Sequence, residues 1–215
     1  MDRKQFWLRA ALHAVALGAL VYVLMGAAGP QWETSNRHDR VLEAGVWAVR
    51  FLLFSLAMSP ANTYLGWRSA IKLRKPAGLW AFGFGALHFG LSFVESTPLG
   101  TFLTPPLPLY IVLGVAGLLI LAALASTSTR WAQRRLGKNW KRLHRLVYAG
   151  GVAVVAHVLL ATEMSKRVYV RYPDLTYEVR VYIVILTILL ILRLPFVRQV
   201  LREGAFQLAR RLGEA

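Results

Sequence analysis

Six apolar stretches, each about as long as a membrane is thick, recur along the chain. They lie at about residues 6–28, 41–59, 77–95, 108–126, 143–161 and 179–195. A helix of about 20 apolar residues crosses the hydrocarbon core of a bilayer, which is roughly 30 Å thick, and it satisfies its backbone hydrogen bonds internally. The sequence therefore predicts an all-α membrane protein, a six-transmembrane-helix bundle that forms a single domain over residues 1–215 with no soluble domain.

The first stretch fits two interpretations. It follows the basic residues Arg3, Lys4 and Arg9 and precedes the small residues at 26–28, as the apolar part of a cleaved signal peptide would. Its apolar run is longer than the usual signal-peptide core of about 7 to 15 residues. We therefore expect a retained membrane helix.

The basic residues predict the orientation of the chain. If both termini are cytoplasmic, 19 of the 26 Lys and Arg residues fall in cytoplasmic segments and 6 in outside loops. Cytoplasmic loops of membrane proteins carry such an excess of positive charge. The net charge of +16 thus indicates a multi-pass protein of the bacterial inner membrane, surrounded by lipid, and makes a nucleic-acid partner unnecessary.

Composition excludes several kinds of redox site. The chain has 56% apolar and 17% charged residues, and it contains no cysteine. Thiolate catalysis, Cys-ligated zinc, iron–sulfur clusters and covalently attached c-type haem all need cysteine. No G-x-G-x-x-G unit or P-loop is present. Any bound metal must therefore use imidazole or oxygen ligands.

Two histidines lie at similar depths in the predicted membrane segments. His88 is about eleven residues past the cytoplasmic start of the third stretch, and His157 about fourteen residues past that of the fifth. Ionisable groups at such depths are costly and mark functional sites. Two such imidazoles could ligate one haem iron from both faces; alternatively, they are structural core histidines between closely packed helices. The small residues that could leave a slot for the flat macrocycle are Gly83, Gly85, Ala86, Gly90, Gly150, Gly151, Ala153 and Ala156.

His144 and Arg74 lie nearer the cytoplasmic side. His144 precedes His157 by 13 residues, an axial offset of about 20 Å, but on an ideal helix the two rings are about 140° out of phase. Either local unwinding at Gly150 and Gly151 realigns them, or His144 faces something else. Arg74, fourteen residues before His88, returns to within about 40° of the same face. Arg74 could contact a haem propionate, take the place of a second ligand, or simply extend to the membrane surface.

Three further expectations concern individual residues. His13 is expected in the core. Arg50, inside the second stretch, needs a partner such as Glu43 or a cofactor carboxylate. Residues 126–129 can cap a short basic amphipathic helix that ends at Gly137 and lies along the inner surface.

Two motifs carry a resemblance to a known family. Residues 73–93 (LRKPAGLWAFGFGALHFGLSF) and 121–148 (LAALASTSTRWAQRRLGKNWKRLHRLVY), followed by the Ala–His pair at 156–157, resemble the MsrQ (YedZ) family. Its members are haem-binding membrane subunits of periplasmic protein-methionine-sulfoxide reductase systems. The wider relatives are ferric-reductase-like membrane domains, which include the NADPH oxidases.

The resemblance implies specific cofactors and partners. It implies that His88 and His157 ligate a b-type haem and that His144 is the matching position for a second, inner haem, giving one or two haems. Wider relatives have a histidine where this chain has Arg74, which leaves the second inner ligand open. The resemblance also implies FMN, electrons from the quinone pool or a cytoplasmic flavin reductase, and their delivery to a periplasmic MsrP-type molybdopterin reductase. Catalysis on the oxidised methionine is then expected in that partner, with this chain as the electron-transfer subunit.

Other functions fit the same residues. A ferric-chelate reductase or a quinone reductase would share the haem core. A transporter or an assembly factor would use the histidines structurally or to carry protons, and it would purify without haem.

Overall fold

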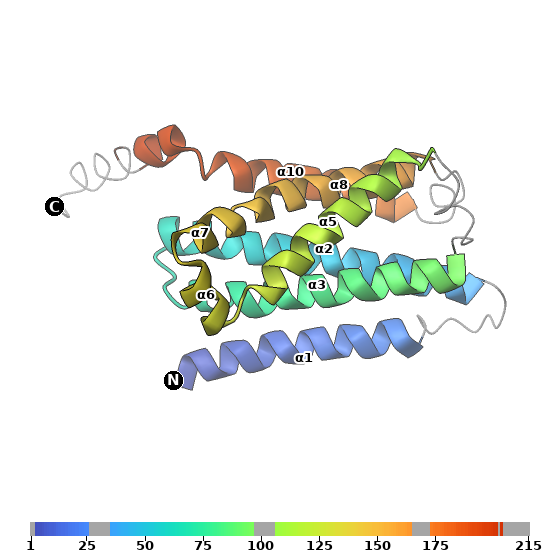
Figure 1. Ribbon diagram of the computed structural model, residues 1–215, viewed down its shortest axis with the longest axis horizontal. Helices are drawn as coiled ribbons and strands as arrows, with labels where there is room; N and C mark the ends of the chain where they lie inside the picture. The colour runs from blue at the N-terminus through green and yellow to red at the C-terminus, as the bar shows by residue number, and fades with distance from the viewer. Residues whose placement is uncertain (1–2, 26–34, 97–105, 165–172, 202, 204–215) are drawn as a thin grey trace.

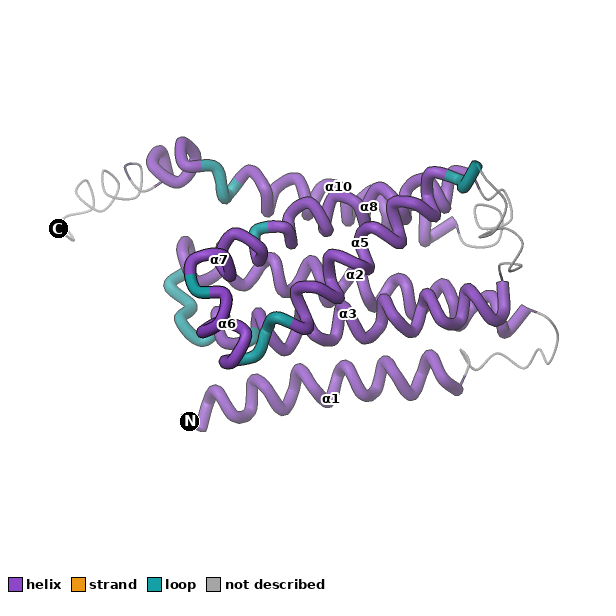
Figure 2. The backbone as a smooth tube through the Cα atoms, in the orientation of Figure 1, coloured by secondary structure: helices purple, strands orange, loops and turns teal. Residues whose placement is uncertain are grey.

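The computed structural model describes residues 3–25, 35–96, 106–164, 173–201 and 203, and within these ranges the chain is helical, without strands (Figure 2). The prediction of an all-α protein is confirmed. The helices are α1 (Arg3–Met25), α2 (Ser35–Tyr64), the short 3-10 helix η1 (Ala70–Lys72), α3 (Arg74–Leu91) with the π-helical turn η2 (Ser92–Ser96), α5 (Leu109–Ser126), α6 (Arg130–Leu136), α7 (Lys138–His144), α8 (Leu146–Met164) and α10 (Pro173–Ile191).

Five segments are long and apolar enough to cross a membrane. They comprise α1, α2 from Arg40, the segment Ala70–Val94 that contains α3, α5, and the segment Lys138–Thr162 that contains α7 and most of α8. The sixth candidate is broken, because Tyr177–Ile191 and Pro195–Leu201 meet at a bend of 79° and form one span only if the pair is taken together. The protein is thus a multi-pass membrane protein with five to six candidate spans, each overlapping one of the predicted stretches.

The long helices run side by side in alternating directions (Figure 1). α2 packs mainly against α3, and α5 mainly against α8. α10 covers α8 and α2, whereas α1 flanks the bundle against α2 and α3. The core lies where α2 meets α3, and its largest fully buried side chains include Phe84, Leu52 and Leu56. Two pairs of helices therefore form the body of the protein.

The short helices α6 and α7 close one end of the bundle (Figure 1). Thr129 caps α6, because its side-chain oxygen accepts a hydrogen bond from the backbone N–H of Ala132 at 3.1 Å. Gly137 ends α6 with φ of 49°, a left-handed conformation that glycine adopts without steric cost. The predicted cap, the short basic helix and its glycine stop are confirmed.

His13 does not lie in the core, so that prediction is wrong. Its side chain on α1 is exposed, and its Nδ1 accepts a hydrogen bond from the indole Nε1 of Trp80 at 2.9 Å. The physical reason is the position of α1 beside the bundle, where only 17% of its most apolar window is buried. A histidine on this helix contacts α3 only along one edge.

Candidate functional site: a paired-histidine cavity

His88 on α3 and His157 on α8 face each other across a cavity. Their ring centroids are 6.0 Å apart, and the ring planes are inclined by 72°. The depth argument from the sequence thus brings together the correct two side chains. The cavity has a volume of about 250 Å³, and we call it the paired-histidine cavity. Its lining is mainly aliphatic and includes Val41, Gly45, Val49, Leu52, Gly85, His88, Ser92, Tyr110, Ile111, Gly114, Leu118, Leu121, Val154, His157 and Thr162.

Each imidazole is fixed by a backbone carbonyl of the neighbouring helix. The Nδ1 of His88 lies 2.8 Å from the carbonyl oxygen of Val41 on α2, and the Nδ1 of His157 lies 2.6 Å from that of Tyr110 on α5. A carbonyl oxygen only accepts hydrogen bonds, so each Nδ1 carries the proton and each Nε2 keeps its lone pair. This is the arrangement in which metal-ligating histidines are usually held.

Two glycines allow the imidazoles to approach these helices closely. A Cβ atom placed on Gly45 would lie 3.0 Å from the Nδ1 of His88, and one placed on Gly114 would lie 2.8 Å from the Nδ1 of His157. Neither position was identified from the sequence, because both lie on helices that carry no histidine of the pair. Gly45 and Gly114 therefore form a floor beneath the two rings.

The two halves of the site are related by one sequence offset. Each histidine follows its carbonyl partner by 47 residues. His157 follows His88 by 69 residues, and the same 69 residues separate Tyr110 from Val41 and Gly114 from Gly45. The helix pair α2–α3 is thus matched by α5–α8 at every residue that holds an imidazole. This sparse repeat was not recognised from the sequence, and the recurring spacing of glycine and histidine is the signal that could have revealed it.

The small residues near the histidines play other parts than the predicted slot. Of the glycines named from the sequence, only Gly85 lines the cavity. Gly150 and Gly151 pack against the side chains of Ile120 and Leu186, and a methyl group added to Gly83 or Gly90 would have no atom of a neighbouring element within 4 Å. For those four glycines the expectation of a slot is wrong, because they face other helices or open space.

The paired imidazoles suit a metal held in a flat macrocycle. Metal–imidazole bonds of about 2 Å on both sides of one ion put two ring centres about 6 Å apart, close to the observed 6.0 Å. Within the described residues, no three His, Asp or Glu side chains form a group that could hold a metal ion. A tetrapyrrole would supply four further nitrogen ligands, and the aliphatic walls suit its faces.

A second cavity of about 420 Å³ lies towards α6 and α7. Four cationic side chains, those of Arg74, Lys75, Lys141 and Arg145, line it together with His144, and its described lining residues include no carboxylate. We call it the basic cavity. Leu52 and Leu121, again 69 residues apart, line both cavities. The two cavities therefore adjoin at this leucine pair.

His144 is held differently from the paired histidines. Its Nε2 lies 3.2 Å from the hydroxyl of Thr127, and its ring lies against that of Trp140 with centroids 4.1 Å apart. The indole Nε1 of Trp140 also donates to the carbonyl of Thr127 at 2.9 Å. The nitrogen that is available in His88 and His157 is thus engaged in His144.

Arg74 and Lys75 occupy the opposite wall of the basic cavity. A guanidinium nitrogen of Arg74 lies 3.5 Å from the hydroxyl of Ser59, and the Nζ of Lys75 donates to the carbonyl of Ser128 at 2.6 Å. The 69-residue offset pairs His144 with Lys75 rather than with Arg74. Two cations therefore face His144 where a second imidazole would be needed for a symmetric site.

The helix that carries His144 and His157 is interrupted, but not at the predicted place. A turn at Arg145 separates α7 from α8, whereas Gly150 and Gly151 lie within regular α-helix. At the turn, the N–H of Arg145 bonds to the carbonyl of Arg142, three residues before it, at 3.2 Å. The expected unwinding at the glycine pair is wrong, because the glycines serve close helix packing instead.

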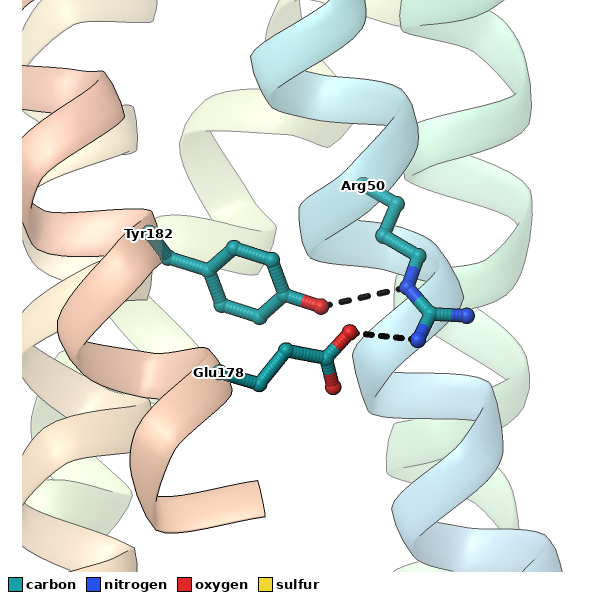
Figure 3. A network of polar contacts seen from close by, with 3 residues as sticks. All are labelled: Arg50, Glu178 and Tyr182. Carbon is teal, nitrogen blue, oxygen red and sulfur yellow. Dashed lines mark hydrogen bonds and ion pairs between the residues drawn. The ribbon is translucent and has the colours of Figure 1, made fainter. Parts of the chain in front are cut away.

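Arg50 binds a carboxylate and a phenol of α10 (Figure 3). Its Nη2 lies 2.5 Å from the Oε1 of Glu178, its Nε donates to the hydroxyl of Tyr182 at 3.1 Å, and its guanidinium carbon lies 4.9 Å from the ring centre of Trp47. The sequence showed that this arginine needs a partner, and the structure identifies Glu178 and Tyr182. The network fastens α10 to α2.

Fold and site together define a class: multi-pass helical membrane proteins with a two-imidazole cofactor cavity inside the bundle. The family described as ferric reductase like transmembrane component matches residues 44–156, which include His88 and most of α2 to α8 and end one residue before His157. The chain belongs to this family of ferric reductase-like transmembrane components.

Individual relatives are more specific. Over 165 residues the chain is 31% identical to the protein-methionine-sulfoxide reductase heme-binding subunit MsrQ of Enterobacter sp. (strain 638), a match that covers 74% of this chain and 81% of that protein. Subunits of the same name from Bordetella pertussis and Agrobacterium fabrum are 39% and 41% identical over 118 and 123 residues. These two matches cover 53% and 54% of this chain, and 57% and 55% of those relatives. The chain thus spans just over half the length of these two relatives, and the resemblance to MsrQ inferred from the motifs is confirmed.

Proposed function

We propose that this protein is a membrane electron-transfer subunit that passes electrons through b-type haem to a periplasmic molybdopterin methionine-sulfoxide reductase of the MsrP type. It would thereby support the repair of oxidised periplasmic proteins. The observation that carries the proposal is the pair His88 and His157, each with Nδ1 bonded to a carbonyl and Nε2 available as a ligand, in a chain whose relatives are named heme-binding subunits. When bound, the haem would supply a one-electron carrier inside the membrane.

The basic cavity is proposed as the side where electrons enter. In this proposal the chain crosses the inner membrane six times with both termini cytoplasmic, and the donor is the quinone pool or a cytoplasmic flavin reductase. Cationic side chains at Arg74, Lys75, Lys141 and Arg145 would attract the phosphate of FMN or the carboxylates of a second haem. Because the two cavities adjoin at Leu52 and Leu121, an electron would cross only a short distance between them.

Direct electron transfer tests the proposed function. The purified protein, reduced with a quinol or with a flavin reductase and its nicotinamide substrate, is mixed with an MsrP-type enzyme and protein-bound methionine sulfoxide. We expect the reduced b-type spectrum to reoxidise only when both the enzyme and its substrate are present. Reoxidation by ferric chelates alone would support a ferric reductase instead, and a preparation without haem after expression with ample haem would support a transporter or an assembly factor.

Replacing His144 with alanine tests the number of haems. The geometry favours a single bis-imidazole haem, because His144 bonds to Thr127 through Nε2 and faces Lys75 and Arg74. We therefore expect His144→Ala to leave the ratio of haem to protein and the low-spin spectrum unchanged within error, as measured by pyridine haemochrome assay and protein determination. A fall in the ratio to about half, with the spectrum of the paired-histidine site retained, would instead assign a second haem to His144.

A further inference from the structure

Gly45 and Gly114, the floor beneath the two imidazoles, do not themselves bind a cofactor. We propose that they are positioning residues, which set the orientation of His88 and His157 and thereby determine how tightly, and with which ligand geometry, the protein holds its haem. The proposal rests on the proposed function, since it concerns haem binding.

Each glycine lies very close to its imidazole. A methyl group on Gly114 would lie 2.8 Å from Nδ1, 2.9 Å from Cε1 and 3.2 Å from Cγ of His157, and one on Gly45 would lie 3.0 Å from Nδ1 and 3.2 Å from Cε1 of His88. Protein carbon atoms do not normally approach side-chain atoms this closely. Both rings therefore lie directly on a helix backbone, at positions that no side chain can share.

A hydrogen bond is formed beside each glycine. Val41 and Tyr110, which accept from the two Nδ1 atoms, each precede their glycine by four residues and so lie one helical turn away on the same face. The carbonyl fixes the direction of the N–H bond, and the glycine lets the edge of the ring reach it. A methyl group at either glycine would push the ring away from the carbonyl and turn its Nε2 from the direction that the hydrogen bond sets.

The same arrangement occurs twice in the chain. Carbonyl, glycine and histidine recur with identical spacing in α2–α3 and in α5–α8, although the residues between them differ. Packing alone does not require this, because α5 and α8 also approach each other at Gly117, where the contact is with the side chain of Val154. The glycine floor is thus linked to the histidines rather than to helix approach in general.

Gly114→Ala is the decisive variant, and Gly117→Ala is its matched control. Both add one methyl group to α5, and both methyl groups would lie 2.8 Å from the nearest atom of α8, but that atom belongs to His157 in the first case and to Val154 in the second. Alanine has a higher helix propensity than glycine, so a loss cannot come from a weaker helix. Gly83→Ala, whose methyl group would have no atom of a neighbouring element within 4 Å, controls for substitution as such.

The experiment uses the purified haem-containing protein and each variant. We expect Gly114→Ala to lose haem to excess apomyoglobin about tenfold faster, since disturbing an outer partner of a metal ligand typically costs about 10- to 100-fold in affinity. We also expect a shift in the low-spin ferric EPR signal, which reports the orientation of the two imidazole planes. Gly45→Ala should act in the same direction but less strongly, because its overlap begins at 3.0 Å, and it decides the outcome if Gly114→Ala does not fold.

Each outcome has one interpretation. If Gly114→Ala retains the haem-loss rate and the EPR signal of the unsubstituted protein, the positioning role is wrong while the proposed function stands. If Gly117→Ala has the same effect as Gly114→Ala, the glycines serve helix packing and the inference is overturned. If the unsubstituted protein has no bis-imidazole haem spectrum, the proposed function itself is wrong and the inference falls with it.

Discussion

Replacing His157 with alanine is expected to abolish the reduced b-type absorption of the purified protein. His157 lies on α8 and faces His88 at 6.0 Å between ring centroids, so its removal would leave the haem with a protein ligand on one face only. Loss of an outer partner of a ligand already costs about 10- to 100-fold in metal affinity, and loss of the ligand itself should cost more than about 100-fold. Haem per protein, from pyridine haemochrome and protein assays, measures the effect.

The equivalent substitution on the other helix should have the same result. His88→Ala removes the partner ring, and the two halves of the site are matched residue by residue, so we expect a loss similar to that of His157→Ala. His13→Ala is the control: its side chain is exposed on α1 and bonds to Trp80, so its removal should leave the spectrum intact. A normal reduced spectrum in both His88→Ala and His157→Ala would show that neither histidine binds the haem.

The pairing of His88 with His157 was predictable because it depends on helical rise alone. Each residue adds about 1.5 Å along an α-helix, so counting from a membrane boundary gives a depth without knowledge of helix packing. The cap at Thr129 and the stop at Gly137 were predictable for a similar reason, since capping chemistry is local. Features that depend on one helix, or on the membrane itself, can thus be derived from the sequence.

The floor of the site was not predictable in the same way. Gly45 and Gly114 lie on helices that carry no ligand, and a glycine in an apolar helix gives no sign of which neighbour it touches. The glycines near the histidines in the sequence attracted the prediction instead, although Gly150 and Gly151 in fact pack on Ile120 and Leu186. Choosing between them requires the relative rotation of neighbouring helices, which local sequence does not determine.

The partner of Arg50 was out of reach for a related reason. The cost of a charge in a membrane segment shows that a partner exists, but it does not say on which helix. Glu178 lies 128 residues further along the chain, whereas Glu43, the nearest carboxylate on the same helix, was the natural candidate. The position of α10 across α2 decides the pairing, and the chain just beyond α10 also approaches α2 where a guanidinium nitrogen of Arg193 donates to the carbonyl of Leu56 at 2.6 Å.

Replacing Glu178 with glutamine is expected to destabilise the protein by about 1 to 3 kcal/mol in detergent micelles. An arginine near the centre of a membrane helix costs about 2.5 to 3.5 kcal/mol, and the exposed fractions of the two side chains, 40% for Arg50 and 32% for Glu178, reduce the expected effect. Tyr182→Phe removes only the 3.1 Å hydrogen bond to Nε of Arg50 and should cost about 1 kcal/mol. Thermal unfolding of the purified protein measures both.

A double substitution separates the ion pair from general damage to α10. Arg50→Met alone leaves Glu178 without its counter-charge, whereas Arg50→Met combined with Glu178→Gln removes both charges and should be more stable than the sum of the two single effects predicts. We expect a coupling free energy of about 1 to 2 kcal/mol, within the range for residues that share one network. Additive single effects would show that the contact in Figure 3 contributes no net stability and that apolar packing alone holds α10 on α2.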